Sequence, residues 1–251
     1  MSEDDKDDVI DVTDQKIERG FDRDVDYGPM KESLIKEIKE LYPKLFKRKP
    51  YLVTISNKLM YCIISIIQLR NGSRISEAIN AFRLFLQNGA NNLDSKVTVK
   101  VGKTGGIKTK TTKNITITTT KDGVKTKTIS KGKEKYHSKI RHRKMMFPKS
   151  WLTKAFDIDT DKIIIELFDH FKKERQDYID DCKMRKRVLG YMLKHHDSNT
   201  HSLRYAFINF MIYVEKEPLT TVAKFVGHTN VSQLVTYTQQ KRCDDIFAKD
   251  I

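Results

Sequence analysis

Apolar residues recur at the three- and four-residue spacing of a helix in several stretches of the chain. Residues 31–40 and 54–70 predict two consecutive helices, and Phe46–Pro50 predicts the break between them because proline interrupts a helix. A helix from Thr160 and another from about Tyr178 to Lys194 are expected later in the chain. The apolar positions that define these helices, and so the expected core, are Leu34, Ile35, Ile38, Leu59, Cys62, Ile63, Ile66, Ile67, Ile164, Leu167, Phe168 and Phe171.

Two further segments combine turn residues with helical spacing. Residues 71–78 (NGSRISEA) predict a turn followed by a helix that continues toward Leu84, with Arg74 at the helix N-terminus. Residues 220–237 predict two short helices, which pack through Val222, Phe225, Val226 and Leu234.

Residues 95–149 have a different pattern, in which Thr and Val alternate with polar residues at period two. Gly105-Gly106 and Asp122-Gly123 are turn pairs that would close hairpins. The segment holds 17 Lys or Arg and only two acidic residues. We therefore expect a small, basic antiparallel β-sheet inserted into a mainly helical α+β fold; the alternative is a lysine-rich insertion that is partly disordered.

The charge of the chain is unevenly distributed. The 251 residues carry a formal net charge of +15, yet residues 1–30 have a net charge of −7, which leaves +22 for residues 31–251. A domain this basic is typical of proteins that bind a polyanion, most often nucleic acid. Residues 1–30 are expected to be a disordered acidic tail, either solvated without a role or covering the basic face until DNA displaces it.

Cysteine and histidine spacing argues against a disulfide framework and against a metal site. Cys62, Cys182 and Cys243 are an odd number without a C-x-x-C pair. His195-His196 are adjacent in sequence, so they point to different faces, and no acidic or thiol ligand lies at usable spacing. The acidic N-terminus lacks a signal-peptide pattern, and the longest apolar run is too short and too interrupted to span a membrane. We expect an intracellular protein without membrane association or cofactor.

The stretch His201-Ser202-Leu203-Arg204 is the clearest candidate for chemistry. A His and an Arg three residues apart share one face of a helix, so they can offer an imidazole and a guanidinium to one phosphate. An isolated H-x-x-R is more often a solvated surface pair. Arg74, at a predicted helix N-terminus where backbone N–H groups favour an anion, adds a second cationic group.

Four segments together resemble the three boxes and the nucleophile of the tyrosine recombinase (phage integrase) family: RISEA from Arg74, HSLRYAF from His201, VGHTN from Val226, and Tyr237. The four segments follow the order of the family's motifs. The separations of 24 residues from Arg204 to His228 and of 9 residues from His228 to Tyr237 also agree with that family. The resemblance extends from Lys31 to the C-terminus and implies a catalytic domain of the tyrosine recombinase fold over residues 31–251, with 95–149 as its basic sheet.

The resemblance also implies roles for these residues. Arg74, Arg204 and His228 would surround the scissile phosphate, Tyr237 would attack it, and His201 would accept the phenol proton. A lysine in a β-turn would protonate the leaving 5′ oxygen. Lys103, 29 residues after Arg74, fits by spacing, whereas Lys131 and Lys133 look locally like the family's G-K-G-x-K loop but lie much further along the chain. No cofactor is required, and Glu77 is expected to support the fold.

Double-stranded DNA is the expected partner, contacted through basic residues of the inserted sheet: Lys131, Lys133, Lys135, Arg141, Arg143 and Lys144. The family's preceding helical clamp domain is not evident, so we expect weak site preference and a homo-oligomer on DNA, a tetramer, docked through residues 242–251.

A type IB topoisomerase is the alternative function, although that class usually has Lys where His201 stands here. A non-catalytic DNA-binding protein of the same fold is a third possibility. Few alanines and many Lys, Asn and Ile hint at an AT-rich virus or mobile element, so the site of action is a prokaryotic cytoplasm, or the nucleus or viral replication site of a eukaryotic host.

Overall fold

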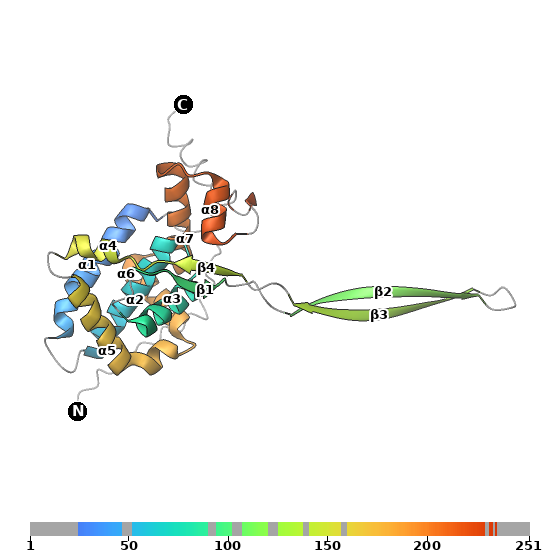
Figure 1. Ribbon diagram of the computed structural model, residues 1–251, viewed down its shortest axis with the longest axis horizontal. Coiled ribbons are helices and arrows are strands. Elements are labelled where there is room, and N and C mark those ends of the chain that lie inside the picture. Colours follow the sequence, from blue (N-terminus) through green and yellow to red (C-terminus); the bar gives the residue numbers. More distant parts are fainter. Residues whose placement is uncertain are drawn as a thin grey trace. The chain divides into compact units, whose positions relative to one another are not determined.

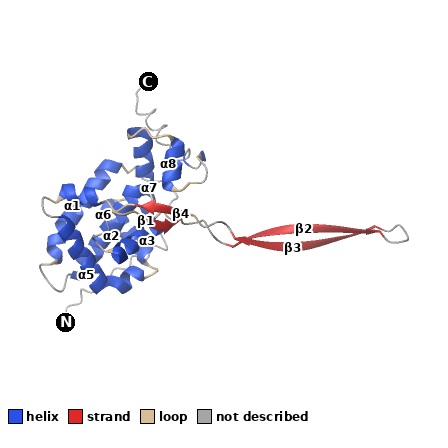
Figure 2. Cartoon of the chain, viewed as in Figure 1, coloured by secondary structure: helices blue, strands red, loops and turns tan. Residues whose placement is uncertain are grey.

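The computed structural model describes residues 25–46, 52–89, 94–101, 107–119, 125–137, 141–156, 160–228, 231–232 and 234. The chain is mainly helical with a small amount of β-structure, as predicted (Figures 1 and 2). It divides into two compact units, one formed by the residues up to Val99 and from Lys144 onward, the other by Lys100–Arg143. None of the described helices is both long and apolar enough to cross a membrane.

The first two helices confirm the predicted pair. α1 (Tyr27–Leu45) buries one residue per turn, namely Met30, Leu34, Ile38, Leu41 and Leu45. It begins at Tyr27, inside the segment predicted as tail, because Tyr27 and Met30 extend its apolar stripe by one turn: the Tyr27 ring stacks on Phe210 at 4.2 Å and meets Trp151 edge-on at 6.0 Å. Residues 1–24 lie outside the described part of the chain.

α2 (Leu52–Asn71) is the central helix of the larger unit and contacts α1, α3 (Ile75–Asn88), α6 (Met184–His196) and α7 (Thr200–Asn209). Each residue from Leu59 to Leu69 is buried, so polar members of this run must find partners inside the protein. The long apolar run therefore forms a core helix surrounded by other helices.

The later helices differ from the prediction in their boundaries. α4 (Lys149–Ala155) was not predicted, and α5 (Thr160–Asp180) extends past Tyr178 before α6 starts at Met184. The break is stabilised locally, because the Asp181 carboxylate accepts a hydrogen bond from the Lys183 N–H at 2.8 Å and pairs with Arg187 at 2.8 Å. The predicted stripe of α5 is confirmed: Ile164, Leu167, Phe168 and Phe171 are all buried.

A second apolar cluster is formed at the C-terminal side of the larger unit. α7 continues into a π-helical turn (Phe210–Val214), and α8 (Leu219–Val226) packs against this turn (Figure 1). The buried members of the cluster are Phe207, Ile208, Val222, Ala223, Val226 and Leu234. Of the two short helices predicted here, α8 is confirmed. Its Phe225 side chain is half-exposed and stacks on Phe207, with ring centroids 5.3 Å apart.

The strands form two separate two-stranded sheets, where one sheet was predicted. β1 (Val97–Lys100) pairs with β4 (His142–Met145), and both contribute buried apolar residues. β2 (Ile107–Thr119) and β3 (Lys125–His137) pair antiparallel over 13 residues, from Ile107↔His137 to Thr119↔Lys125.

The structure places the three predicted turn segments in different positions relative to the strands. Asp122-Gly123 fall between the paired ends of β2 and β3, and Gly105-Gly106 precede β2; both pairs lie outside the described residues. The stretch ISKGKEK resembles a turn in sequence, but Lys131 and Lys133 lie in the middle of strand β3. Its local similarity to a G-K-G-x-K loop was misleading, because Gly132 pairs with Thr112 within the regular ladder.

Gly72 closes the α2–α3 turn in a conformation that other residues rarely adopt. Its φ is +53°, and a Cβ atom there would lie 2.2 Å from the Phe207 ring. We predict that Gly72→Ala lowers the free energy of unfolding by roughly 1–3 kcal/mol or more, because it adds backbone strain and a clash with a core ring.

Chemical denaturation measures this change, and Gly190→Ala in α6 is the matched control. A Cβ at Gly190 meets nothing within 4 Å, so that substitution should be neutral or stabilise by up to about 1 kcal/mol. Equal effects of the two substitutions would contradict the close approach of Phe207 to the turn.

Candidate active site

Arg204 occupies the centre of the candidate site and is buried, with 1% of its surface exposed. One terminal nitrogen of its guanidinium donates to the Gly72 carbonyl oxygen at 2.7 Å, and the other donates to the Val226 carbonyl oxygen at 2.9 Å. Gly72 stands two residues before Arg74, and Val226 stands two residues before His228. A single side chain thus joins the three segments that carry Arg74, His201 with Arg204, and His228.

Arg74 is the N-cap of α3, and Glu77 binds both its backbone and its side chain. The buried Glu77 carboxylate accepts from the Arg74 backbone N–H at 3.3 Å and from its guanidinium at 3.1 Å. The Arg74 side chain is 27% exposed and Glu77 only 1%. The carboxylate therefore closes the first turn of α3 and fixes the base of the arginine, while the guanidinium remains accessible to solvent.

Gln68 makes a second connection between the α2–α3 turn and α7. Its side-chain amide nitrogen donates to the carbonyl oxygen of Ser73 at 3.1 Å and to that of Thr200. Ser73 precedes Arg74, and Thr200 precedes His201. The buried amide therefore fixes the backbone positions from which the first arginine and the first histidine of the site extend.

The N-terminus of α7 presents His201 on the surface. Asn199 is the N-cap, and its side-chain oxygen accepts from the backbone N–H groups of His201 at 2.7 Å and Ser202 at 2.8 Å. The exposed His201 ring lies edge-on to Tyr205 with centroids 4.7 Å apart. Arg204, one turn further along, is buried, so the interpretation of the pair as solvated surface residues is wrong for the arginine.

His228 follows the end of α8. Gly227 adopts a left-handed conformation with φ 75°, and the His228 backbone N–H donates to the Ala223 carbonyl oxygen at 2.8 Å. This cap ends the helix and turns the chain directly after Val226, the residue bound by Arg204. His228 is partly buried.

Two predicted catalytic residues, Tyr237 and Lys103, lie outside the described residues. The segment that leads to Tyr237 is anchored, because Leu234 is buried in the C-terminal apolar cluster and its N–H donates to the Val231 carbonyl at 2.8 Å. The segment that leads to Lys103 follows β1, whose Val97 and Val99 are buried in the core.

Asn71 ties the sheet of β1 and β4 to the α2–α3 turn. Its amide nitrogen donates to the Met146 carbonyl at 2.9 Å, and its amide oxygen accepts from the Met146 N–H at 2.9 Å. Met146 directly follows β4. The turn that carries Arg74 and the sheet strand that leads toward Lys103 therefore belong to one hydrogen-bonded assembly.

The predicted DNA-binding residues occupy different environments. Lys131, Lys133 and Lys135 occupy alternate positions of β3, and Arg141 and Lys144 are exposed at β4. Arg143 is buried at 8% exposure because the alternation of β4 places it on the same face as Met145.

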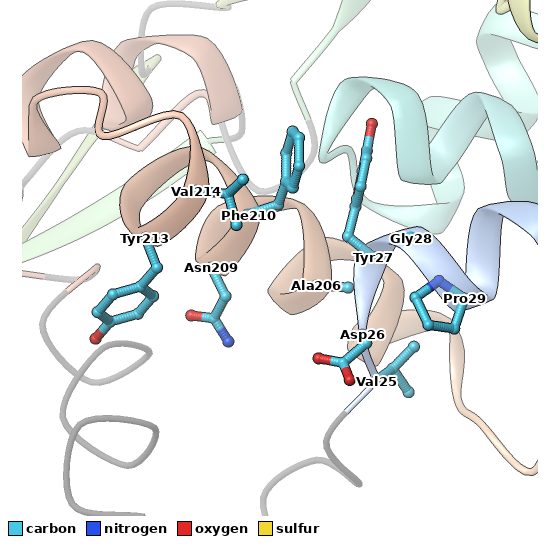
Figure 3. Close-up of a pocket in the computed structure, with 10 residues that line it drawn as sticks. All are labelled: Val25, Asp26, Tyr27, Gly28, Pro29, Ala206, Asn209, Phe210, Tyr213 and Val214. Carbon is cyan, nitrogen blue, oxygen red and sulfur yellow. The ribbon is translucent and has the colours of Figure 1, made fainter. Parts of the chain in front are cut away.

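A pocket of about 300 Å³ lies elsewhere in the described part of the chain, between the N-terminal end of α1 and the end of α7 with its π-helical turn (Figure 3). None of Arg74, His201, Arg204 and His228, the predicted catalytic residues that the structure describes, lines it. Burial, opposed in part by the charge of Arg70, raises the pKa of Tyr27 in this pocket to about 12, so its phenol is a poor nucleophile at neutral pH.

Gln68, Asn71 and Asn199 are supporting residues that the motifs did not identify. A signal for Gln68 exists in the sequence, because it is a polar residue inside an apolar core helix. Asn199 could have been found as a typical N-cap before the HSLR stretch. Asn71 has no comparable local signal, since its partner Met146 lies 75 residues away.

Comparison with known proteins gives relatives that align over nearly the whole chain. The chain is 37% identical over 251 residues to "Putative integrase V10" of Sputnik virophage, covering 98% of this chain and 96% of the virophage protein. It is 27% identical over 234 residues to "Putative integrase ORF241" of Acidianus two-tailed virus, covering 93% of this chain and 70% of that protein. An uncharacterized protein of Methanocaldococcus jannaschii is 27% identical over 239 residues, covering 91% and 86%. No protein-family model and no solved structure matches the chain.

The role of Gln68 can be tested by Gln68→Met, which keeps the approximate volume and removes both donated hydrogen bonds. The carbonyl oxygens of Ser73 and Thr200 are then left without this donor, so we expect the free energy of unfolding to fall by roughly 1–3 kcal/mol. Ser65→Ala on the same helix is the control, because the Ser65 hydroxyl donates only to the Met192 sulfur, a weak acceptor, at 3.3 Å. A loss no larger than that of Ser65→Ala in urea denaturation would refute the linking role.

Proposed function

The chain belongs to the integrase family, and we propose that it is a tyrosine recombinase, which breaks and rejoins DNA through a 3′-phosphotyrosyl intermediate. The observation that carries the proposal is the bridging position of Arg204, which joins the segments of Arg74, His201 and His228 although these are up to 154 residues apart in sequence. Four residues suited to phosphate chemistry, two arginines and two histidines, thus belong to segments that the Arg204 side chain joins.

The arginines suit the charge that develops during the reaction. In-line attack on a phosphodiester increases the negative charge on its non-bridging oxygens, and donors that are already oriented stabilise this charge without reorganisation. The two carbonyl bonds of Arg204 hold its guanidinium plane, and Glu77 holds the base of Arg74. We assign both guanidinium groups and His228 to the phosphate.

The proton transfers are assigned to His201, Tyr237 and a lysine. The Tyr237 phenol oxygen bonds to phosphorus, its proton passes to His201, and the bond from phosphorus to the 5′ oxygen breaks. The lysine donates a proton to that oxygen, which leaves as a 5′-hydroxyl. Attack by a 5′-hydroxyl of another strand reverses the sequence, so the phosphotyrosyl bond is used to rejoin DNA without an external energy source.

Chain connectivity favours Lys103 as the acid. Lys103 follows Val99 by four residues, which span at most about 14 Å, and Tyr237 follows Leu234 by three, which span at most about 11 Å. Val99 and Leu234 are both buried. Lys131 and Lys133, in contrast, lie within a 13-residue strand, where a β-turn lysine is not expected.

Double-stranded DNA is the proposed partner, and the register of β2 and β3 concentrates the basic positions on one face of the pair. Residues directly opposite each other share a face, so Lys113, Lys125, Lys127, Lys131, Lys133 and Lys135 occupy positions of one face, and only Lys108 and Lys110 occupy the other. Lys113 is directly opposite Lys131, an arrangement of like charges that is unfavourable in isolation and that a polyanion would relieve. The major groove of B-DNA admits a two-stranded β-ribbon.

The alternatives are less well supported. His201 stands at the position where type IB topoisomerases usually have Lys, and the integrase relatives favour recombination. A purely DNA-binding protein would not need Arg74, His201, Arg204 and His228 together.

Strand exchange joins two duplexes, so we further propose that four copies act together on DNA.

The nucleophile is tested with DNA that carries a nick near the cleavage site, so that cleavage releases a short fragment and traps the covalent complex. We expect the parent chain to form a denaturation-resistant adduct and Tyr237→Phe to form none while binding DNA with unchanged affinity, because only the phenol oxygen is lost. Tyr213→Phe is the control and should still form the adduct. An adduct with Tyr237→Phe would assign the attack to another residue.

The DNA-binding face is tested by the salt dependence of affinity. Each lysine that neutralises a phosphate contributes about one unit to the slope of log affinity against log salt concentration. We therefore expect the triple variant Lys131→Ala, Lys133→Ala and Lys135→Ala to reduce this slope by up to about three units. The double variant Lys108→Ala and Lys110→Ala, on the opposite face, should change it little; a larger effect of the double variant would reverse the assignment of the faces.

A further inference from the structure

Three helices bring one carboxylate, one thiol and one imidazole to a common point away from the candidate active site. Glu37 belongs to α1, Cys62 to α2, and His196 is the last residue of α6. One ligand atom from each lies within 4.8 Å of the others, and no other such group is found among the described residues. In sequence the three residues are 25 and 134 positions apart, which is why neighbouring-residue spacing did not reveal them.

The cluster is enclosed on most sides. Cys62 is fully buried, the side chain of His196 is 4% exposed, and that of Glu37 is 21% exposed. Glu37 Oε2 lies 2.9 Å from His196 Nε2, yet Nε2 has no well-aligned hydrogen bond among the described residues. The imidazole nitrogen thus contacts the carboxylate, and the Cys62 sulfur lies within the same 4.8 Å cluster, which is a donor set that a metal ion can use.

The surroundings orient these groups as a metal site requires. Ser33 Oγ lies 3.3 Å from His196 Nδ1, and when Nδ1 donates its proton to this hydroxyl, Nε2 presents a lone pair to the cluster. The Tyr191 hydroxyl lies 3.0 Å from the Cys62 sulfur and can donate to the thiolate. Such partners around the ligands fix the orientation of metal-binding side chains.

We propose that Glu37, Cys62 and His196 bind one zinc ion that fastens α6 to α1 and α2. Zinc accepts sulfur, nitrogen and oxygen ligands together in tetrahedral geometry, and the solvent-accessible side at Glu37 leaves the fourth position for a water molecule. Tetrahedral ligand atoms are separated by roughly 3.3–3.7 Å, so small side-chain rotations adapt the present distances. Binding replaces the thiol proton of Cys62, which is released to solvent.

The zinc ion would stabilise the connection into the active-site helix. His196 ends α6, and only Asp197 and Ser198 separate it from Asn199, the N-cap of α7 that precedes His201. The proposal concerns folding stability and does not depend on the assignment of Tyr237 or on recombination. Its test therefore uses the metal alone as probe and needs no DNA.

Cobalt(II) provides a direct readout, because a thiolate ligand gives a charge-transfer band in the near ultraviolet. The full chain carrying Cys182→Ser and Cys243→Ser retains only Cys62 as a thiol and should bind one equivalent of cobalt with this band, which added zinc abolishes. His196→Gln should lower the metal affinity at least about tenfold, whereas His195→Gln, at the adjacent exposed histidine, should not. Zinc should raise Tm in the parent and in His195→Gln but not in His196→Gln.

Glu37→Gln provides a second variant if His196→Gln does not fold, and circular dichroism reports folding in each case. Gln is a neutral ligand, so its metal affinity should also fall. The absence of the thiolate band in the single-thiol chain, or equal affinities of the His195→Gln and His196→Gln variants, would overturn the proposal.

Discussion

The two hydrogen bonds from the buried Arg204 guanidinium are the constraint on which the site depends. A buried charge is costly unless its donors are satisfied, and here two backbone carbonyls accept from it. These carbonyls belong to the turn before Arg74 and to the helix end before His228, so satisfying the arginine also positions two other motif residues. The turn is close enough to α7 only because residue 72 lacks a side chain.

α2 supplies most of the remaining connections. Along one helix, Gln68 bonds the backbone before Arg74 and before His201, Asn71 bonds the strand end after β4, and Cys62 contributes to the cluster with Glu37 and His196. All three residues are buried. The helix that appears from its sequence to be merely apolar is therefore the scaffold that relates the segments carrying Arg74, His201 and Met146 to one another.

Hydrophobic periodicity was sufficient to predict the main helices, because α1 and α5 each bury an apolar stripe that is visible in the sequence, and the apolar positions of α2 belong to a run that is buried on all sides. Their ends were less predictable, since Tyr27 joins α1 through aromatic contacts with Phe210 and Trp151 that lie far away in sequence. The period-two pattern indicated strands but not that β2 and β3 would pair only with each other. The burial of Arg204 and Arg143, and the bonds of Asn71, depend on tertiary neighbours that no local pattern specifies.

The most direct test of the account is whether Arg74 acts on the charge of the scissile phosphate. Cleavage rates of the parent and of Arg74→Ala should be compared on an ordinary phosphodiester and on a methylphosphonate, in which a methyl group replaces a charged non-bridging oxygen at the scissile position. On the phosphodiester the variant should be slower by at least about 100-fold, as is typical when one oriented donor is lost. On the methylphosphonate most of this difference should disappear, because the transition state carries one negative charge fewer for the guanidinium to stabilise. An equal loss on both substrates would contradict the account and limit Arg74 to a structural role with Glu77.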